Sequence, residues 1–155
     1  MNFHALATHY GRITPSKIHV ALPLSIMAAL YWLSSLPGLP RPEDPALYSV
    51  FYWVPPSIQN ILHIPAYAIL AWSWHWALRA WTRTSSALAI GSCSITSLYG
   101  IFDEWHQSFI PGRVASFTDV ALDFAGALVG TWLAVRMIRY VASCSVIADT
   151  TRIHK

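Results

Sequence analysis

Four long runs of apolar residues divide the chain. They cover residues 18–36, 58–78, 87–102 and 117–138. A helix rises about 1.5 Å per residue, so roughly 20 residues cross the hydrocarbon core of a bilayer. The third run is short, and we expect it to continue through Trp105. The pattern therefore predicts four transmembrane helices.

The links between these runs are short, which favours antiparallel neighbours in an all-α, four-helix integral membrane bundle. The longest link, residues 37–57, contains the aromatic stretch ALYSVFYWVPP, which we expect to lie in the membrane interface. Residues 1–17 form a predicted cytoplasmic tail, residues 18–142 the membrane domain, and residues 143–155 a polar, poorly ordered cytoplasmic tail. Gly126 and Gly130, in G-x-x-x-G spacing, predict a close contact between helices.

Composition agrees with a membrane protein. Hydrophobic residues make up 55% of the chain and charged residues 11%, against about 25% charged residues in a soluble domain. The net charge of +3 is small and the basic residues form no continuous tract, so nucleic acid is not an expected partner. Cys93 and Cys144 are not expected to pair, and no C-x-x-C spacing indicates a metal.

Basic residues divide unequally between the two sides of the predicted bundle. Arg41 and Arg113 lie on one side, and the other eight lie on the opposite side. Basic residues concentrate in cytoplasmic segments of membrane proteins. The chain is thus predicted to be a multi-pass membrane protein with both termini in the cytoplasm.

Ionisable and amide side chains gather at the outer end of this arrangement. The predicted second, third and fourth helices and the loop before the fourth supply eight of them: His63, Tyr67, Asp103, Glu104, Gln107, Arg113, Asp119 and Asp123. Several pairs are three or four residues apart and so share a helical face. Charged groups within a membrane are costly and usually face a bundle interior or a wet cavity. We therefore predict an outward-facing polar pocket.

Each of these residues also has a structural explanation. His63 can hydrogen-bond a neighbouring helix, and Asp119 can interact with the dipole of its own helix, worth about 0.3–1 kcal/mol. Arg113 can anchor at lipid headgroups. Their coincidence at one end of the bundle is what favours a functional site.

The order of these residues resembles the VanZ-like family of small bacterial membrane proteins. The matching segments are NILHIPAYAIL and YGIFDEWHQSFIPGRVASFTDVALDFAGALVG. The family pattern is a histidine followed four residues later by tyrosine, then D-E-x-x-Q, a proline–glycine–arginine turn, an aspartate, and a polar residue before glycine. In this sequence it falls on His63, Tyr67, Asp103, Glu104, Gln107, Arg113, Asp119 and Gly126.

Two positions depart from the family pattern. Gln59-Asn60 stands where the family often has Asp-Lys, so a lysine that could contact a phosphate is missing. Asp123 stands where the family often has Asn, which adds negative charge. The resemblance implies a cell-envelope role in the bacterial plasma (inner) membrane. Because the family is named for a teicoplanin-resistance protein, it also implies a link to glycopeptide resistance. It supplies no reaction.

Three hypotheses for the pocket stay open. A membrane-embedded enzyme acting on an envelope lipid would use His63 or Glu104 as general acid or base, with Asp119 orienting the histidine and Arg113 holding an anionic headgroup. A binder of an amphiphilic or lipid-linked molecule would need Arg113 and the aromatic rim but no proton transfer. The predicted binding residues are Tyr67, Asp103, Gln107, Arg113 and Asp123. A proton-coupled transporter would use His63, Glu104 and Asp123 as a relay.

The predicted contacts and partners are specific. We expect Arg113 to pair with Glu104 or Asp119, and Asp123 to donate a hydrogen bond within the bundle. No cofactor and no metal are predicted, and a metal held by His63, His106 and an acid is the less favoured alternative. The expected partners are membrane lipids and an amphiphilic or lipid-linked envelope ligand.

Overall fold

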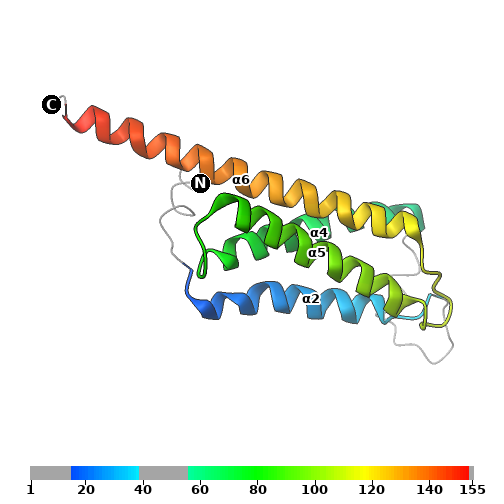
Figure 1. The fold of residues 1–155 in the computed structure, drawn as a ribbon. Helices are drawn as coiled ribbons and strands as arrows, with labels where there is room; N and C mark the ends of the chain where they lie inside the picture. Colours follow the sequence, from blue (N-terminus) through cyan, green and yellow to red (C-terminus); the bar gives the residue numbers. More distant parts are fainter. Residues whose placement is uncertain (1–14, 39–55, 154–155) are drawn as a thin grey trace, which may run out of the picture.

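The computed structural model describes residues 15–38 and 56–153, with side chains described through residue 143. The described part is all-α, as predicted, and holds these elements (Figure 1): a 3-10 helix η1 (Lys17–Val20), α2 (Ala21–Ser34), α4 (Pro56–Leu78), α5 (Ser85–Gln107) and α6 (Phe117–Ile153). The aromatic stretch predicted to lie in the interface falls outside the described residues, apart from Pro56.

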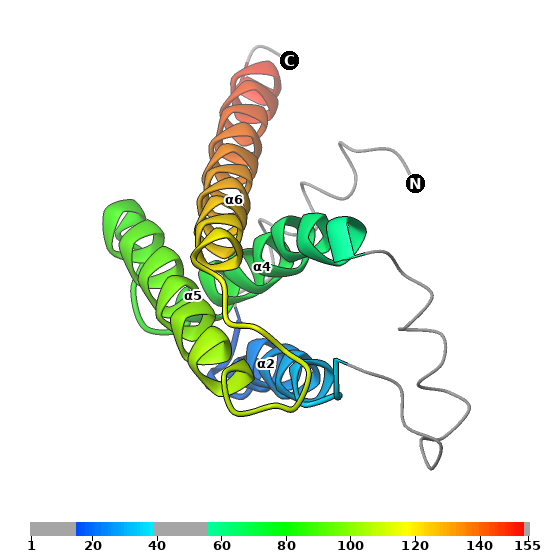
Figure 2. The same ribbon diagram turned by 90° about the vertical axis from the view of Figure 1, so that its right-hand side faces the viewer.

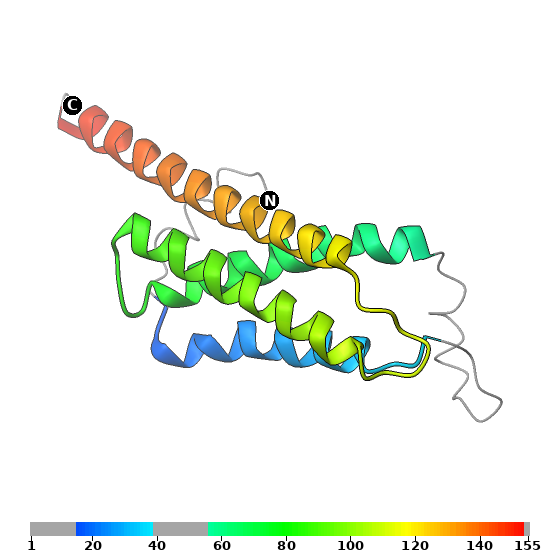
Figure 3. The ribbon, with the colours of Figure 1, turned by 45° about the vertical axis from the view of Figure 1, so that its right-hand side comes forward.

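Capping and turn chemistry define the link between α5 and α6. Ser116 caps α6, since its hydroxyl accepts a hydrogen bond of 3.1 Å from the Thr118 N–H. The chain turns at Pro111-Gly112, where Gly112 has a φ of 79° that only glycine adopts readily. The link packs beside the end of α2 (Figure 3), where the Gly38 N–H donates to Pro111 O at 3.1 Å.

The last helix is longer than the sequence predicted. The prediction of a poorly ordered tail from residue 143 is wrong, because α6 continues as a helix to Ile153. Residues 131–153 contain no proline or glycine, so nothing in the sequence stops the helix where the apolar run ends. Figure 1 shows α6 extending well beyond the other helices.

Helix α4 is the centre of the bundle. It contacts α2, α5 and α6, whereas α2 and α6 make no contact with each other within the described residues (Figure 2). The predicted glycine contact is confirmed: a Cβ on Gly126 would lie 2.5 Å from Ile64 O, and one on Gly130 would lie 2.1 Å from Ala68 O. Both glycines therefore let α6 approach the backbone of α4.

Three helical segments of the described chain are long and apolar enough to cross a membrane: Lys17–Ser34, Ser85–Gln107 and Phe117–Ser143. Helix α4 is as long as α5, at 23 residues. Its mean hydropathy is lowered by Gln59, Asn60, His63 and His75. Because α4 is packed among the other three, its polar groups can face protein rather than lipid. We treat it as the fourth span.

Candidate functional site

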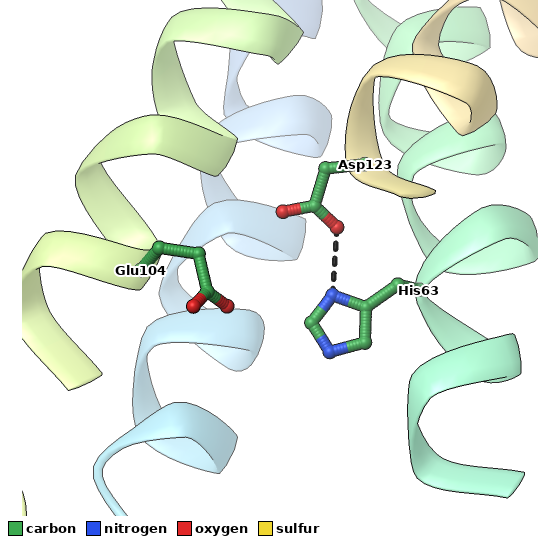
Figure 4. A group of neighbouring side chains, drawn as sticks. All are labelled: His63, Glu104 and Asp123. Carbon is green, nitrogen blue, oxygen red and sulfur yellow. Dashed lines mark hydrogen bonds and ion pairs between the residues drawn. The ribbon is translucent and has the colours of Figure 1, made fainter. Parts of the chain in front are cut away.

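The best-defined contact at the polar end joins α4 to α6. His63 Nδ1 and Asp123 Oδ1 are hydrogen-bonded at 2.7 Å, and Asp123 is only 1% exposed (Figure 4). Gly100 on α5 makes room for this carboxylate, since a Cβ there would lie 2.9 Å from Asp123 Oδ2. The prediction that Asp119 orients His63 is wrong, because the residue one turn further along α6 makes the contact. That Asp123 donates a hydrogen bond stays a prediction.

Glu104 comes from α5 and points toward the same place (Figure 4). Its Oε2 accepts a hydrogen bond of 2.8 Å from the Ser116 N–H, which fixes the carboxylate against the start of α6. Its Oε1 is buried and has no hydrogen-bond partner among the described residues. Glu104 thus has one oxygen held and one free.

A second polar group lies on the α4–α5 side. Asp103 Oδ2 accepts hydrogen bonds from the Tyr67 hydroxyl at 3.3 Å and from Gln107 Nε2 at 3.2 Å. Gln107 follows Asp103 by one helical turn, the face-sharing spacing seen in the sequence. The three side chains are all buried, and all three line the polar cavity described below.

Arg113 has a different role from the predicted one. Its Nε donates to Leu36 O at 3.2 Å and its Nη2 to Leu33 O at 3.4 Å. Carbonyls at a helix C-terminus lack intrahelical donors and carry partial negative charge, so a cation there is favourable. The predicted pairing with Glu104 or Asp119 is wrong, because the guanidinium caps α2.

Two cavities lie along the α2–α4 interface. The polar cavity, of about 250 Å³, is lined by Leu30, Leu33, Ser34, Gln59, Leu62, His63, Ala66, Tyr67, Asp103, Gln107 and Arg113. The apolar cavity, of about 660 Å³, is lined by Leu22, Ile26, Ala68, Ile69, Trp72, Ser73, Trp76 and Leu133. The apolar cavity lies between α2, α4 and α6, where α2 and α6 do not contact each other.

Negative charge dominates the polar end. Asp103, Glu104, Asp119 and Asp123 are each at most 9% exposed, and each has one buried oxygen without a hydrogen-bond partner in the described part of the chain. At this end, Asp123 forms an ion pair with His63 when the histidine is protonated. A buried carboxylate is costly unless it is paired, so each of these groups is stabilised either by protonation or by a compensating cation.

The alternative metal set with His106 is not the one the structure assembles. His106 lies against Tyr31, with ring centroids 4.4 Å apart. The residues that do converge are His63, Glu104 and Asp123, each of which offers a ligand atom within 4.8 Å of the others. We call these three residues the three-helix cluster.

Sequence reasoning missed the backbone partners of the site. Gly100, the Ser116 N–H and the carbonyls of Leu33 and Leu36 all shape it. A glycine within a membrane helix, one turn before Glu104, was the available signal for Gly100. Backbone donors and acceptors leave no such signal.

Comparison with known families decides the classification. The sequence profile of the VanZ/LLP1 family matches residues 8–139, most of the chain. The chain belongs to the VanZ/LLP1 family. The match covers α2, α4, α5 and the membrane part of α6, so the resemblance seen in the sequence is confirmed. No significant match to this VanZ/LLP1 protein was found among curated proteins or solved structures.

Proposed function

We propose that this VanZ/LLP1 protein binds an amphiphilic or lipid-linked molecule of the cell envelope. The polar end of the ligand occupies the polar cavity, and its apolar chain runs through the apolar cavity. The observation that carries the proposal is the alignment of the two cavities along one interface between α2 and α4.

The alignment follows from helical spacing. On α4, Leu62 and Ala66 of the polar cavity continue into Ile69 and Ser73 of the apolar cavity. These positions lie three or four residues apart, so they form one stripe on the helix. Between His63 and Trp76 the interface is about 20 Å long, more than half the roughly 30 Å hydrocarbon core. A ligand with a polar end and a long chain fits this shape.

Selectivity comes from the polar end of the ligand. Lipid tails are as apolar as the cavity wall, so a chain that moves from lipid into the apolar cavity gains little free energy. The buried carboxylates favour a ligand end rich in O–H or N–H donors. Arg113 supports an anionic headgroup less well than the sequence suggested, because its guanidinium already binds the carbonyls of α2.

The proposal places the polar cavity at the outer face of the bacterial plasma membrane, with both termini in the cytoplasm. The unequal division of basic residues, eight against two, supports this orientation. Reporter fusions after Lys155 should read as cytoplasmic, and fusions within residues 103–116 as external. The reverse result would move the cavity to the cytoplasmic face.

Co-purification tests binding directly. Protein extracted from native membranes should carry one amphiphile in excess over the bulk lipid, measured by mass spectrometry. Leu62→Trp and Ile69→Trp add bulk to the polar and apolar cavities from positions 52% and 61% exposed. Each should lower the bound amount by about tenfold, the effect of losing 1.4 kcal/mol of binding free energy.

Leu98→Trp is the matched control, because Leu98 is 65% exposed on α5 and lines neither cavity. It should leave the bound amount unchanged. Equal lipid profiles for all three variants and the unaltered protein would refute the proposal.

An acid–base enzyme is the second candidate, and the hydrogen bond of Asp123 to His63 favours it. A carboxylate bound to one ring nitrogen fixes the orientation of an imidazole and stabilises its charged form, while the other nitrogen serves as general base. Since His63 lines the polar cavity, it can reach a ligand there. If the protein is an enzyme, His63→Gln should co-purify with an amphiphile of a different mass from that bound to the unaltered protein. If it is a binder, His63→Gln should carry less of the same amphiphile.

Membership in the VanZ/LLP1 family is what supports extending the proposal to glycopeptide resistance. Expression of the protein in a sensitive host should then raise the concentration of teicoplanin needed to stop growth, and Leu62→Trp should remove the effect. Equal susceptibility with and without the protein would separate this chain from the resistance role.

A further inference from the structure

The three-helix cluster brings together donor atoms that metals bind. His63 comes from α4, Glu104 from α5 and Asp123 from α6, and one ligand atom of each lies within 4.8 Å of the others (Figure 4). We propose that this cluster is a binding site for a divalent transition metal of the zinc type. The site goes beyond the proposed function, because it needs no amphiphile to form.

Each carboxylate of the cluster has an oxygen available to a metal. Glu104 Oε2 is held by the Ser116 N–H at 2.8 Å, whereas Asp123 Oδ1 and His63 Nδ1, 2.7 Å apart, both belong to the cluster, and a metal bound at Nδ1 would replace the hydrogen bond between them. The second oxygen of each is buried and without a hydrogen-bond partner among the described residues. Hydrogen bonds that hold one atom of a ligand and leave another available are typical of groups that surround a metal.

Charge balance also favours a divalent cation. Metal ligation requires both carboxyl groups to be ionised and the imidazole to be neutral. In that state the cluster carries a formal charge of −2, and both carboxylates are at most 4% exposed. Charge buried at this depth is unfavourable without a partner. Arg113 does not supply the compensation, because its guanidinium binds Leu33 O and Leu36 O. A dication in the cluster neutralises it.

The donor set selects the kind of metal. Zinc binds imidazole nitrogen and carboxylate oxygen, whereas calcium takes six to eight oxygen ligands and magnesium keeps several waters. Bonds of about 2.0–2.2 Å place zinc ligands roughly 3–4 Å apart, so the three side chains need to close by about 1 Å. Three protein ligands would leave one position for a water or another ligand. Of the three residues, His63 also lines the polar cavity.

The test measures metal alone, with protein purified in detergent. After removal of metal with a chelator and dialysis against ZnCl₂, the unaltered chain should retain about one zinc per chain, as a single three-ligand site requires. Glu104→Gln and Asp123→Asn should raise the zinc Kd more than about 100-fold, because changes outside the ligand shell alone cost 10–100-fold. His106→Gln removes an imidazole that packs on Tyr31 instead and should leave zinc binding unchanged.

Cobalt substitution of the unaltered protein gives a second measurement that requires no variant to fold. Co²⁺ in the cluster should show the intense visible absorption of four-coordinate cobalt, and zinc should abolish it. The proposal is overturned if the unaltered chain retains no zinc and gives only the weak spectrum of hydrated cobalt. It is equally overturned if Glu104→Gln and Asp123→Asn bind zinc as the unaltered chain does, or if His106→Gln removes the binding.

Discussion

The pair of His63 and Asp123 should be energetically coupled, and more strongly than either residue is coupled to Asp119. The contact is short, 2.7 Å, and joins an aspartate that is 1% exposed to a histidine that is 19% exposed. Removing one member of a fully buried pair typically costs about 3–5 kcal/mol, so His63→Leu should approach this loss and Asp123→Ala should cost less, because the histidine it leaves unpaired lines the polar cavity. Both losses are measured as changes in the free energy of unfolding.

The double variant His63→Leu/Asp123→Ala separates the pair from its surroundings. Its loss should be smaller than the sum of the single losses by about 1.5–3 kcal/mol, the range for hydrogen bonds to charged groups. Neutral bonds between membrane helices average only about 0.6 kcal/mol. Reversible unfolding in mixed micelles, followed by helical circular dichroism with a chelator present, measures the difference.

Asp119 supplies the matched control on the same face of α6. His63→Leu with Asp119→Ala should show a smaller coupling than His63→Leu with Asp123→Ala, because in the described part of the chain Asp119 acts on His63 through its charge and not through a hydrogen bond. Coupling of His63 to Asp119, with additive behaviour for Asp123, would refute the assignment of the pair.

Two further predictions concern stability in detergent. Arg113→Ala should cost about 1–2 kcal/mol, since the hydrogen bonds to the carbonyls of Leu33 and Leu36 are lost. Its effect on the free energy of unfolding should add to that of Glu104→Gln. Coupling of the two above about 0.5 kcal/mol would instead show a direct contact. Gly130→Ala should destabilise the bundle, because its Cβ would lie 2.1 Å from Ala68 O. Gly91→Ala should be neutral or stabilising by up to about 1 kcal/mol, since its Cβ would meet only the flexible end of Leu78 at 3.1 Å. Equal losses for the two alanines would contradict the close contact of α4 and α6.

The sequence predicted where helices lie better than where they end. Residues 58–78 and Pro56–Leu78 nearly coincide. The third helix runs to Gln107, past the apolar run, because the polar turn that closes it contains no helix breaker. An apolar run shows which residues can lie within the membrane, whereas capping residues, glycine and proline show where a helix ends.

At the polar end, the side-chain contact within one helix was predictable, and the side-chain pairing between helices was not. The spacing of Asp103 and Gln107 already places them together. Whether Asp119 or Asp123 faces His63 depends on how far α6 slides along α4, which is set by the backbone contacts of Gly126 and Gly130. A difference of one turn, about 5.4 Å, exchanges the two aspartates. The sequence pattern does not encode that distance.

Photo-crosslinking in native membranes tests the central claim most directly. A diazirine side chain placed at position 62 reports on the polar cavity, and one at position 69 reports on the apolar cavity. Both should capture the same amphiphile, identified by the mass of the adduct, while a diazirine at position 98 on the exposed face of α5 should capture bulk lipid. Capture of the same bulk lipid mixture at all three positions would contradict a ligand that lies along α2 and α4.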